Sequence, residues 1–340
     1  MTDNTAYSLL GHNTFGIDVR CRRFMEYGTA EEAQRVADVL RSTPGQPFMV
    51  IGAGSNLLLT SDYEGTVVHS TVRGISLTEM SDGDAILSCG SGEKWDDVVA
   101  WTADMGFADL VNLTDIPGEV GATAVQNIGA YGAEVSQSLH QVLAIEIATG
   151  QRVVIDGADC GYGYRDSRFK HEWKGRYLIT HVKYRLHRSA KPMLDYGDIR
   201  SELARQGMGE QPLPTELRQV IGDIRRRKLP DPAVKGNAGS FFMNPIVSAD
   251  VLRQLQQRYP TMPHYDMGAD LVKIPAAWLI EQCGWKGRQL GRAAVHDRQA
   301  LVLVNQGEAT GSDIVALCRA IQQDVSQRFG IMLQPEVNIV

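Results

Sequence analysis

Two short polar segments of the chain carry side chains that could act on a small anionic substrate. The first is Tyr164-Arg165-Asp166-Ser167. An arginine guanidinium can grip a carboxylate through two parallel hydrogen bonds, a geometry that lysine cannot supply. The residues alone favour a simpler alternative, in which Arg165 is a surface arginine paired with Asp166.

The second segment places Ser240 between a glycine and two aromatic residues, in Gly236-Asn237-Ala238-Gly239-Ser240-Phe241-Phe242. Its hydroxyl could be held in an apolar pocket. The GxSxG turn of hydrolases is missing, so a serine nucleophile is not indicated. A serine in a turn is more often a hydrogen-bond partner of the backbone, and this alternative stays open.

Two further candidates are a carboxylate and an imidazole. Glu336 lies in Gln334-Pro335-Glu336-Val337, where the alternative is an exposed carboxylate on an edge strand. His296, in Ala294-Val295-His296, could act as a base, although a core or surface histidine is commoner.

Three glycine turns in the first half of the chain suit a nucleotide cofactor. Gly52-x-Gly54 and Gly90-x-Gly92 each follow an apolar strand, and residues 116–121 hold a third turn. Glycine lets the backbone approach a phosphate, and successive N–H groups then form an anion nest. The fingerprint GxGxxG is absent, because Leu57 stands where its last glycine would be, so an ordinary Rossmann site is disfavoured. Spacing alone does not name the cofactor.

Composition excludes several other classes of protein. The 340 residues are 43% hydrophobic and 22% charged, which is typical of globular chains and allows two or three domains. The net charge is −6 and no basic stripe is present, so we expect no nucleic-acid partner. Five widely spaced cysteines indicate neither disulfides nor a metal site. We find no signal peptide and no apolar stretch of membrane-spanning length, so we expect a cytoplasmic protein.

The elements that must position these residues follow from hydrophobic periodicity. Helical spacing of apolar residues predicts six helices. Two are capped by Thr29 and Thr215, three begin at Ser248, Pro275 and Ser312, and one has a face formed by Trp95, Val98, Val99 and Thr102. Alternation and apolar runs predict strands at residues 47–51, 65–69, 85–89, 178–186, 300–305 and 332–339, and a hairpin of 142–148 with 152–155. Residues 188–214 are polar and resemble a linker with one short element around Tyr196. We therefore predict two α+β modules that meet near residues 190–210.

Several strings, taken in order from about Asn13 to Glu336, resemble the MurB family of UDP-N-acetylenolpyruvoylglucosamine reductases. Any one string is weak, but the full ordered set is highly specific. The strings are Asn13-Thr14-Phe15-Gly16, Gly52-Ala53-Gly54-Ser55-Asn56-Leu57-Leu58, Ile116-Pro117-Gly118, Gln126-Asn127-Ile128-Gly129-Ala130-Tyr131-Gly132, Tyr164-Arg165-Asp166-Ser167, Lys228-Leu229-Pro230-Asp231-Pro232, Gly236-Asn237-Ala238-Gly239-Ser240-Phe241-Phe242, Asn244-Pro245 and Pro335-Glu336-Val337.

The resemblance implies a fold, a reaction and two cofactors. The fold would be α+β, with a vanillyl-alcohol-oxidase-type (PCMH-type) FAD-binding domain at residues 15–190, in subdomains of about 15–70 and 71–190. A linker at 191–214 would carry a tyrosine loop, and a substrate domain would span 215–340. NADPH would reduce FAD, and the reduced flavin would pass the hydride to the enolpyruvyl ether of a UDP-sugar, forming UDP-N-acetylmuramate for peptidoglycan. We expect a monomer without a metal.

The resemblance also assigns roles by motif position. Arg165 would bind the enolpyruvyl carboxylate with Glu336 beside it, and Ser240 would protonate the carbon next to that carboxylate. The expected FAD contacts are Gly52, Ala53, Gly54, Ser55, Asn56, Leu57, Gly118, Gln126, Asn127, Gly129, Ala130 and Tyr131. The expected substrate contacts are Tyr196, which closes over the substrate in the longer MurB type, Arg225, Lys228 and Asn244 near the UDP phosphates, and Gln299 near the sugar.

Three residues depart from the pattern of the family. Asp115 and Glu119 flank the Ile-Pro-Gly turn, where a carboxylate would repel a pyrophosphate. We expect both side chains to point to solvent, and they bring the affinity for FAD into question. Arg292 stands where a small residue is usual, which could alter access to the sugar.

Two other functions were weighed against the reductase. One is a flavin oxidase that acts on an alcohol or lactone with oxygen, which would not need the strings around Lys228 and Ser240. The other is a nucleotide-binding protein without catalysis, which would not need Arg165, Ser240 and Glu336 together.

Overall fold

The chain folds into two compact units that interleave along the sequence. The computed structural model describes residues 1–81 and 83–340. The first unit comprises Met1–Ser8, Arg20–Ala53 and Tyr63–Arg227, and the second Leu9–Val19, Gly54–Asp62 and Lys228–Val340. Both mix helices with strands, which confirms the predicted α+β class. None of the helices in the described part of the chain is long and apolar enough to cross a membrane.

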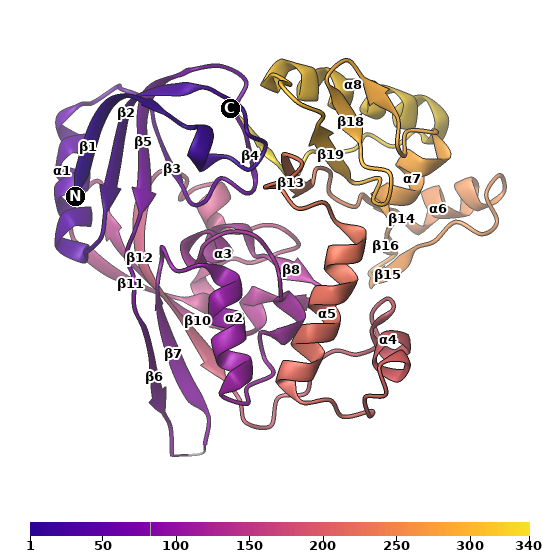
Figure 1. The fold of residues 1–340 in the computed structure, drawn as a ribbon, viewed down its shortest axis with the longest axis horizontal. Coiled ribbons are helices and arrows are strands. Elements are labelled where there is room, and N and C mark those ends of the chain that lie inside the picture. The colour runs from indigo at the N-terminus through magenta and orange to yellow at the C-terminus, as the bar shows by residue number, and fades with distance from the viewer. Residues whose placement is uncertain (82) are drawn as a thin grey trace. The chain divides into compact units, whose positions relative to one another are not determined.

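The first unit contains two sheets (Figure 1). A four-stranded sheet has the order β1-β2-β5-β3, with β1 antiparallel to β2 and the other neighbours parallel: β1 Thr2–Ser8, β2 Arg20–Tyr27, β5 Tyr63–Ser70 and β3 Phe48–Ile51. An antiparallel sheet has the order β11-β10-β12-β7-β6: β11 Arg152–Asp156, β10 Leu139–Glu146, β12 Tyr177–Leu186, β7 Ala85–Gly90 and β6 Ile75–Glu79. The predicted hairpin of β10 and β11 is confirmed.

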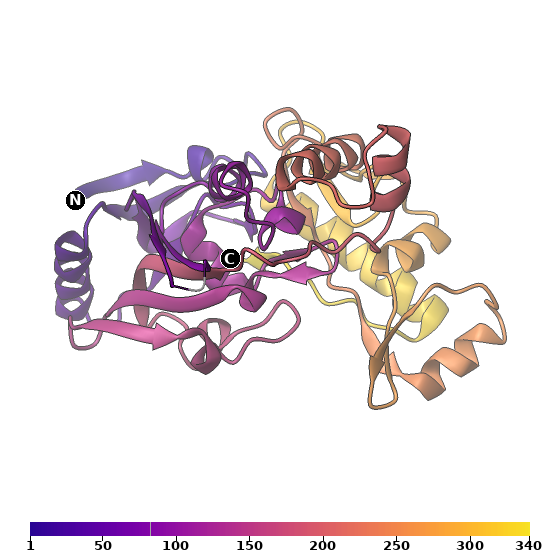
Figure 2. The same cartoon turned by 90° about the horizontal axis from the view of Figure 1, so that it is seen from below.

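Helix α1 (Ala30–Ser42) packs against strands of both sheets (Figure 2). Thr29 accepts a hydrogen bond from the Glu32 amide, as the predicted cap requires. The face formed by Ala33, Val36, Ala37 and Leu40 is buried against a cluster that includes Tyr27 and Leu178. The helix therefore ties the two sheets together.

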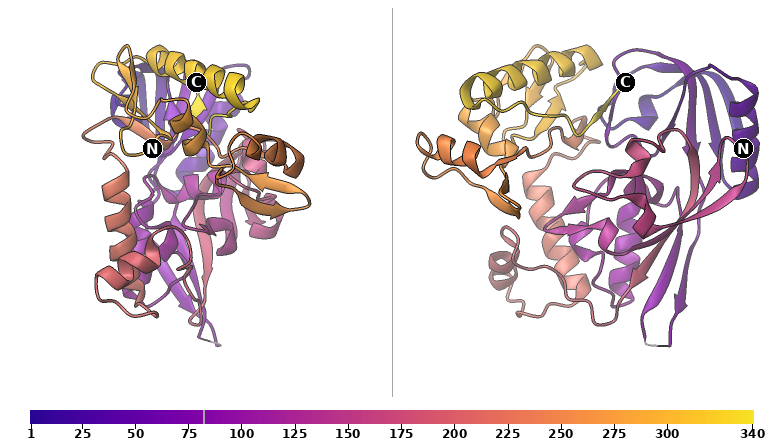
Figure 3. Two further views of the ribbon diagram at one scale, coloured as in Figure 1. Left: turned by 90° about the vertical axis from the view of Figure 1, so that its right-hand side faces the viewer. Right: turned by 180° about the vertical axis from the view of Figure 1, so that it is seen from behind.

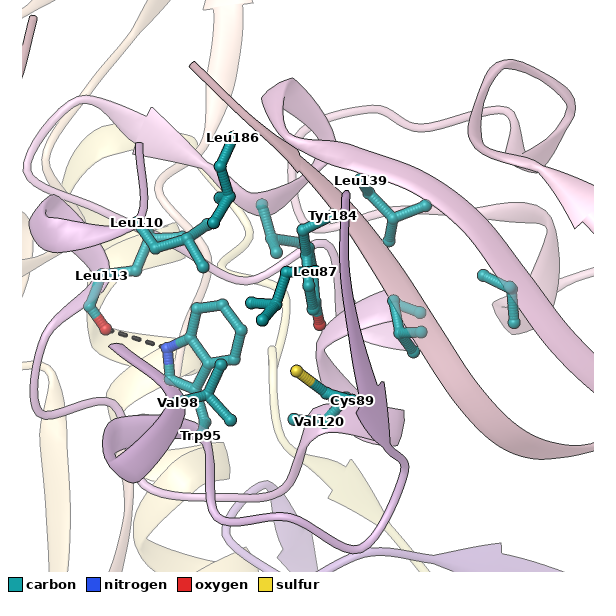
Figure 4. Close-up of a cluster of buried hydrophobic side chains, with 14 of the residues drawn as sticks. Leu87, Cys89, Trp95, Val98, Leu110, Leu113, Val120, Leu139, Tyr184 and Leu186 are labelled. Carbon is teal, nitrogen blue, oxygen red and sulfur yellow. Dashed lines mark hydrogen bonds between the residues drawn. The ribbon is translucent and has the colours of Figure 1, made fainter. Parts of the chain in front are cut away.

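A second buried cluster of the first unit lies between its antiparallel sheet and helices α2 (Trp95–Asp104) and α3 (Val120–Gln126) (Figure 4). It buries Trp95, at the start of α2, against Tyr184 of β12, and the indole Nε1 donates to the Leu113 carbonyl at 3.0 Å. Helix α3 packs on β7 and β12. The remaining elements are β8 Gly129–Ala130, β9 Ala133–Glu134, η2 Val111–Leu113, η3 Val135–Gln137, η4 Gly157–Cys160, η5 Arg168–Lys170, α4 Ile199–Arg205 and α5 Pro214–Lys228.

The second unit has a four-stranded sheet with α8 (Gly311–Phe329) against β18 and β19 (Figure 3). The sheet order is β13-β19-β18-β17: β13 Asn237–Ser240, β19 Val302–Asn305, β18 Ala293–Val295 and β17 Gln289–Leu290. A smaller sheet has the order β14-β16-β15: β14 Ile246–Ser248, β16 Leu271–Lys273 and β15 Tyr265–Gly268. The other elements are η1 Leu10–His12, β4 Leu57–Leu58, α6 Ala249–Gln256, α7 Ala276–Gln282 and β20 Asn338–Ile339.

Four predicted boundaries were wrong. Helix α5 begins at Pro214, so Thr215 lies inside it. Helix α8 is capped by Thr310 rather than begun by Ser312, because Thr310 and Asp313 form a capping box. The short element of the linker is α4, after Tyr196. Only residues 338–339 of the last predicted strand form a ladder, because the segment before them makes separate backbone contacts with Phe241 and Met243.

Candidate functional site

Unusual backbone geometry gathers in the first unit around the predicted site. Eight non-glycine residues of the described chain have a positive φ, and four of them are Asp115 (60°), Asn127 (44°), Tyr131 (50°) and Arg165 (55°). Such residues cost free energy, and they persist where the surrounding structure enforces them. These four lie in or beside the motif segments, where such outliers support the hypothesis of a functional site.

Arg165 lies against the backbone of the Gln-Asn-Ile-Gly-Ala-Tyr segment. Its Nη2 donates to the Gly129 carbonyl at 2.5 Å, and its Nε atom is buried. A Cβ on Gly129 would stand 2.6 Å from Nη1, so only glycine leaves room for this guanidinium. Asp166 instead accepts from the ring of His171 at 2.7 Å. The simple alternative of a surface arginine paired with Asp166 therefore does not describe Arg165.

The tyrosine segment is anchored in the same unit. Asn112, which is 2% exposed, donates to the carbonyls of Tyr131 (3.1 Å) and Met193 (2.8 Å) and accepts from the Met193 amide. Tyr196 is exposed, and its ring meets that of Tyr131 edge to face at 6.1 Å. Sequence reasoning missed Asn112, although a lone asparagine between Val111 and Leu113 was a signal for a buried polar partner.

Arg225 of α5 reaches the turn that precedes α3. Its Nε donates to the Asp115 carbonyl at 3.1 Å, and the Asp115 amide donates to Asp96 at 2.6 Å. Burial lowers the pKa of the Arg225 guanidinium and raises the pKa of the Asp115 carboxyl, which the charge of Arg225 opposes. Asp96, a second missed residue, thereby holds Asp115 in its left-handed conformation.

Ser240 stands at a bulge in the second unit. Strand β13 pairs Asn237 with Val304 and Ser240 with Val302, so one extra residue is accommodated between them. Gly239 takes a φ of 68°, and its amide donates to the Asn237 side chain at 2.9 Å. A bulge of this kind redirects the side chain that follows it. Within the described chain, no residue forms a hydrogen bond with the half-buried Ser240 hydroxyl.

Glu336 is bound to Phe241, the residue that follows Ser240. Its amide donates to the carbonyl of Phe241 at 2.8 Å, and the Phe241 amide donates to Leu301 at 2.7 Å. Its carbonyl accepts from the Asn56 side chain at 3.2 Å. The structure thus brings Ser240, Glu336 and the Gly54–Leu57 segment together in the second unit, whereas Arg165 belongs to the first.

The remaining predicted substrate contacts are spread over the second unit. Lys228 is exposed at the end of α5. The Asn244 side-chain oxygen accepts from the Ala276 amide at 2.9 Å, at the start of α7. The Gln299 oxygen accepts from the Leu301 amide at 3.3 Å, in the turn before β19. Asn244 and Gln299 therefore each hold a local turn, in addition to any ligand contact.

Comparisons with known proteins decide the family. Residues 23–156 match the model of an FAD binding domain, and residues 231–340 match that of the UDP-N-acetylenolpyruvoylglucosamine reductase C-terminal domain. UDP-N-acetylenolpyruvoylglucosamine reductase of Bacteroides fragilis is 48% identical over 334 residues, which cover 98% of this chain and 99% of that protein. The Burkholderia cenocepacia reductase is 44% identical over 347 residues, with 98% and 97% covered. The chain belongs to the UDP-N-acetylenolpyruvoylglucosamine reductase family.

A solved structure supports the fold of this MurB family member. The MurB crystal structure from Thermus caldophilus has a TM-score of 0.66 and 21% identity, over 99% of this chain and 98% of that one. With the FAD binding domain, this similarity confirms the predicted fold class. The chain is an oxidoreductase of the MurB family with an FAD-binding domain.

The residues of the first unit fit a flavin nucleotide. The Gln126 side-chain oxygen is buried and has no hydrogen-bond partner among the residues that the structure describes, so it is available to a ligand donor. A Cβ on Gly52 would lie 3.2 Å from Glu119 Oε2 and 3.5 Å from Ala122, so the Gly52 backbone packs closely against the start of α3. Gly52 and Gln126 would hold FAD.

Other glycines of the predicted nests serve the chain itself. A Cβ on Gly54 would stand 2.0 Å from the His12 carbonyl oxygen. On Gly90 and Gly92 it would stand 2.4 Å and 2.6 Å from the carbonyls of Val72 and Ser70. Close approach of the backbone therefore explains these glycines without a phosphate.

The expectation that Glu119 points to solvent was wrong. Glu119 is 8% exposed, and its carboxylate faces His69 Nε2 at 3.1 Å. Asp115 is half-buried rather than free in solvent. Arg292 pairs with Glu308 at 3.5 Å and is exposed. His296 is buried, as a core histidine is, and burial lowers its pKa.

Asn127 is committed to the protein rather than to a ligand. It is fully buried, donates to Gly163 (2.7 Å) and Glu134 (2.9 Å), and accepts from Ser136 (3.2 Å). Its predicted contact with FAD must therefore come from the backbone. We expect Asn127→Ala to lower the free energy of unfolding by about 3 kcal/mol, because the buried side chain loses three hydrogen bonds. Urea denaturation of the apoprotein measures this loss.

Two variants separate the contributions of the Asn127 amide and of its backbone. Glycine adopts a positive φ freely, so Asn127→Gly should lose the amide bonds but be about 1 kcal/mol less destabilised than Asn127→Ala. The exposed Asn4 of β1 is the control, and Asn4→Ala should change stability by less than about 0.5 kcal/mol. Equal stability of the wild type and Asn127→Gly would contradict the structural role.

Proposed function

We propose that the chain reduces the enolpyruvyl group of UDP-N-acetylglucosamine enolpyruvate with NADPH, giving UDP-N-acetylmuramate for peptidoglycan synthesis. The observation that carries the proposal is Ser240, presented by a bulge beside Glu336 with its hydroxyl available. The family membership supports the substrate. We further propose that the protein is a cytoplasmic monomer without nucleic-acid or membrane partners. We also propose that residues 15–190 form the FAD domain and residues 215–340 the substrate domain, joined by a linker at residues 191–214.

When bound, FAD would supply the hydride chemistry, with NADPH as the donor. Arg165 binds the carboxylate of the substrate, where negative charge accumulates as the double bond accepts the hydride. Ser240 donates its proton to the carbon next to that carboxylate. A serine hydroxyl is a weak acid, but a carbanion-like carbon is basic enough to take the proton at contact distance. Glu336, beside Ser240, orients the reacting group.

The other predicted contacts complete the assignment. Backbone and side-chain groups of Gly52, Ala53, Gly54, Ser55, Asn56, Leu57, Gly118, Gln126, Asn127, Gly129, Ala130 and Tyr131 would hold FAD. Tyr196 would cover the substrate, Arg225, Lys228 and Asn244 would bind its phosphates, and Gln299 its sugar. Arg225 suits the phosphates because its partly desolvated charge interacts strongly with an anion.

An anaerobic absorbance experiment tests the function. Flavin bands that bleach with NADPH and return with the enolpyruvyl UDP-sugar would establish donor, cofactor and acceptor together. Bands that return only with oxygen would instead favour an oxidase. A protein that takes up no FAD would leave a nucleotide-binding protein without catalysis.

A further inference from the structure

The buried carboxylate of Glu119 is part of a three-residue cluster that the proposed reaction does not use. His69 of β5 lies between two carboxylates: its Nδ1 is 3.1 Å from Glu26 Oε1, and its Nε2 is 3.1 Å from both oxygens of Glu119. His69 and Glu119 are each 8% exposed. Glu26 and His69 are direct neighbours in the β2–β5 ladder. The cluster is therefore held by the sheet.

Both contacts of the ring are hydrogen bonds when each ring nitrogen carries a proton. A neutral imidazole donates from one nitrogen only, whereas ionised carboxylates can only accept. An imidazolium between Glu26 and Glu119 satisfies both contacts. Burial alone would lower the pKa of His69, but the hydrogen bonds and charges of Glu119 and Glu26 outweigh it and raise that pKa. Among the described residues, the Tyr27 phenol is a titratable neighbour of Glu119, and its pKa is raised first by burial and also by the charge of Glu119.

The cluster lies against two of the three glycine turns, those of Gly52 and Gly118. Gly52 directly follows Ile51, which pairs with His69 in the ladder of β3 and β5. A Cβ on Gly52 would be 3.2 Å from Glu119 Oε2. Glu119 itself directly follows Gly118, the turn glycine before α3. The Glu119 carboxylate thus lies between the two turns to which we assign the cofactor.

We propose that His69 is a positioning residue whose imidazolium neutralises Glu119, so that this carboxylate can join the two turns without repelling the pyrophosphate of FAD. The inference rests on the assignment of Gly52 and Gly118 to FAD under the proposed function. Coulomb repulsion between an uncompensated, buried carboxylate and a dianion would be strong, because little solvent screens it. The His69–Glu119 pair carries no net charge and retains its hydrogen bonds, and the charge that remains in the cluster is that of Glu26, on the Nδ1 side of the ring.

A double-mutant cycle on FAD affinity tests the proposal. The apoprotein is titrated with FAD by flavin fluorescence at pH 6.5, and its melting temperature is recorded without FAD. We expect His69→Gln to raise Kd about tenfold, because the Glu119 carboxylate is then left without its cation. Glu119→Gln and the double variant should both bind within about threefold of wild type, since the charge is gone. His181→Gln, on β12, is the control.

The pH dependence is a second arm of the same test. The imidazolium is fully present below the ordinary pKa of histidine, and it is lost as pH rises through the raised pKa of folded His69. Affinity of the wild type for FAD should therefore weaken above that pKa, and Glu119→Gln should remove the dependence. This comparison needs no substitution at His69, so it tests the proposed role of the imidazolium even where His69→Gln fails to fold.

The outcomes separate this proposal from the proposed function. Equal weakening in His69→Gln and the double variant would show a structural support without a charge role. A wild-type curve that is flat between pH 6.5 and 9, or one shared with Glu119→Gln, would also overturn the inference. A wild-type apoprotein that binds no FAD at any pH would instead contradict the cofactor assignment itself.

Discussion

Replacing Ser240 by alanine is expected to leave reduction of the flavin by NADPH intact and to slow transfer to the enolpyruvyl substrate by about 10²–10⁴-fold, the usual contribution of a general acid. The reason is that the first half-reaction needs no proton from Ser240, whereas the second ends with one on carbon. The bulge at Gly239 fixes the backbone of this residue, so the truncation removes the hydroxyl and little else. Anaerobic stopped-flow absorbance resolves the two half-reactions.

Two controls sharpen the test of Ser240. Ser240→Cys restores an acidic proton at nearly the same place and should recover part of the transfer rate. Ser312→Ala, an exposed serine in α8 of the same unit, should be indistinguishable from the wild type. Normal product formation by Ser240→Ala would remove the assignment, and equal losses in both half-reactions would point to damaged cofactor binding.

Periodic elements of the fold were predictable, because their signals are local. Helix α1 was correctly predicted from its Thr29 cap and one buried face, and β12 from clean alternation in residues 178–186. Helix α3 was missed, since a seven-residue helix that contains Gly121 resembles a turn in sequence. Strand β2 was missed as well, because its three arginines interrupt the apolar pattern that would indicate its buried positions.

Most of the features that could not be predicted depend on contacts between residues far apart in the sequence. Strand β4 joins the second unit through a parallel pairing with β20, some 280 residues away. No periodicity in residues 54–62 reveals that partner, so the interleaving of the units could not be predicted. Glu119 illustrates the same limit at the level of a side chain: its burial depends on His69, 50 residues away. Because the sequence does not show that His69 is its partner, the Glu119 carboxylate beside a cofactor turn was expected to face water.

The candidate site was predicted from motif identity rather than from physical spacing. The residues alone favoured a surface role for Arg165 and a backbone role for Ser240. The structure adds the physical causes that the motif only implied: Gly129 makes room for a guanidinium, and Gly239 allows the bulge before Ser240. It also gives Asn127 and Gly54 a role in support of the fold, Asn127 through its buried side chain and Gly54 through its close approach to His12.

Replacing Arg165 by lysine is expected to lower kcat/KM for the enolpyruvyl substrate by about 10²–10³-fold, the effect of losing one preorganised donor to developing charge. Lysine keeps the charge but cannot give two parallel hydrogen bonds to a carboxylate. Reduction by NADPH should change by less than about threefold, because the lost contact is made to the second substrate. Arg168→Lys, which alters an exposed arginine paired with Glu172, is the control.

Gly129→Ala tests the same guanidinium without touching it. The new Cβ would stand 2.6 Å from Nη1 and 2.9 Å from the Ala133 carbonyl oxygen, so both the Arg165 guanidinium and the β8–β9 backbone must shift, while the charge and length of Arg165 are unchanged. If position matters as well as charge, this variant should share the kinetic defect of Arg165→Lys, and combining the two should add little because both remove one interaction. Additive losses, or normal kcat/KM in Gly129→Ala, would show that the carboxylate is bound elsewhere.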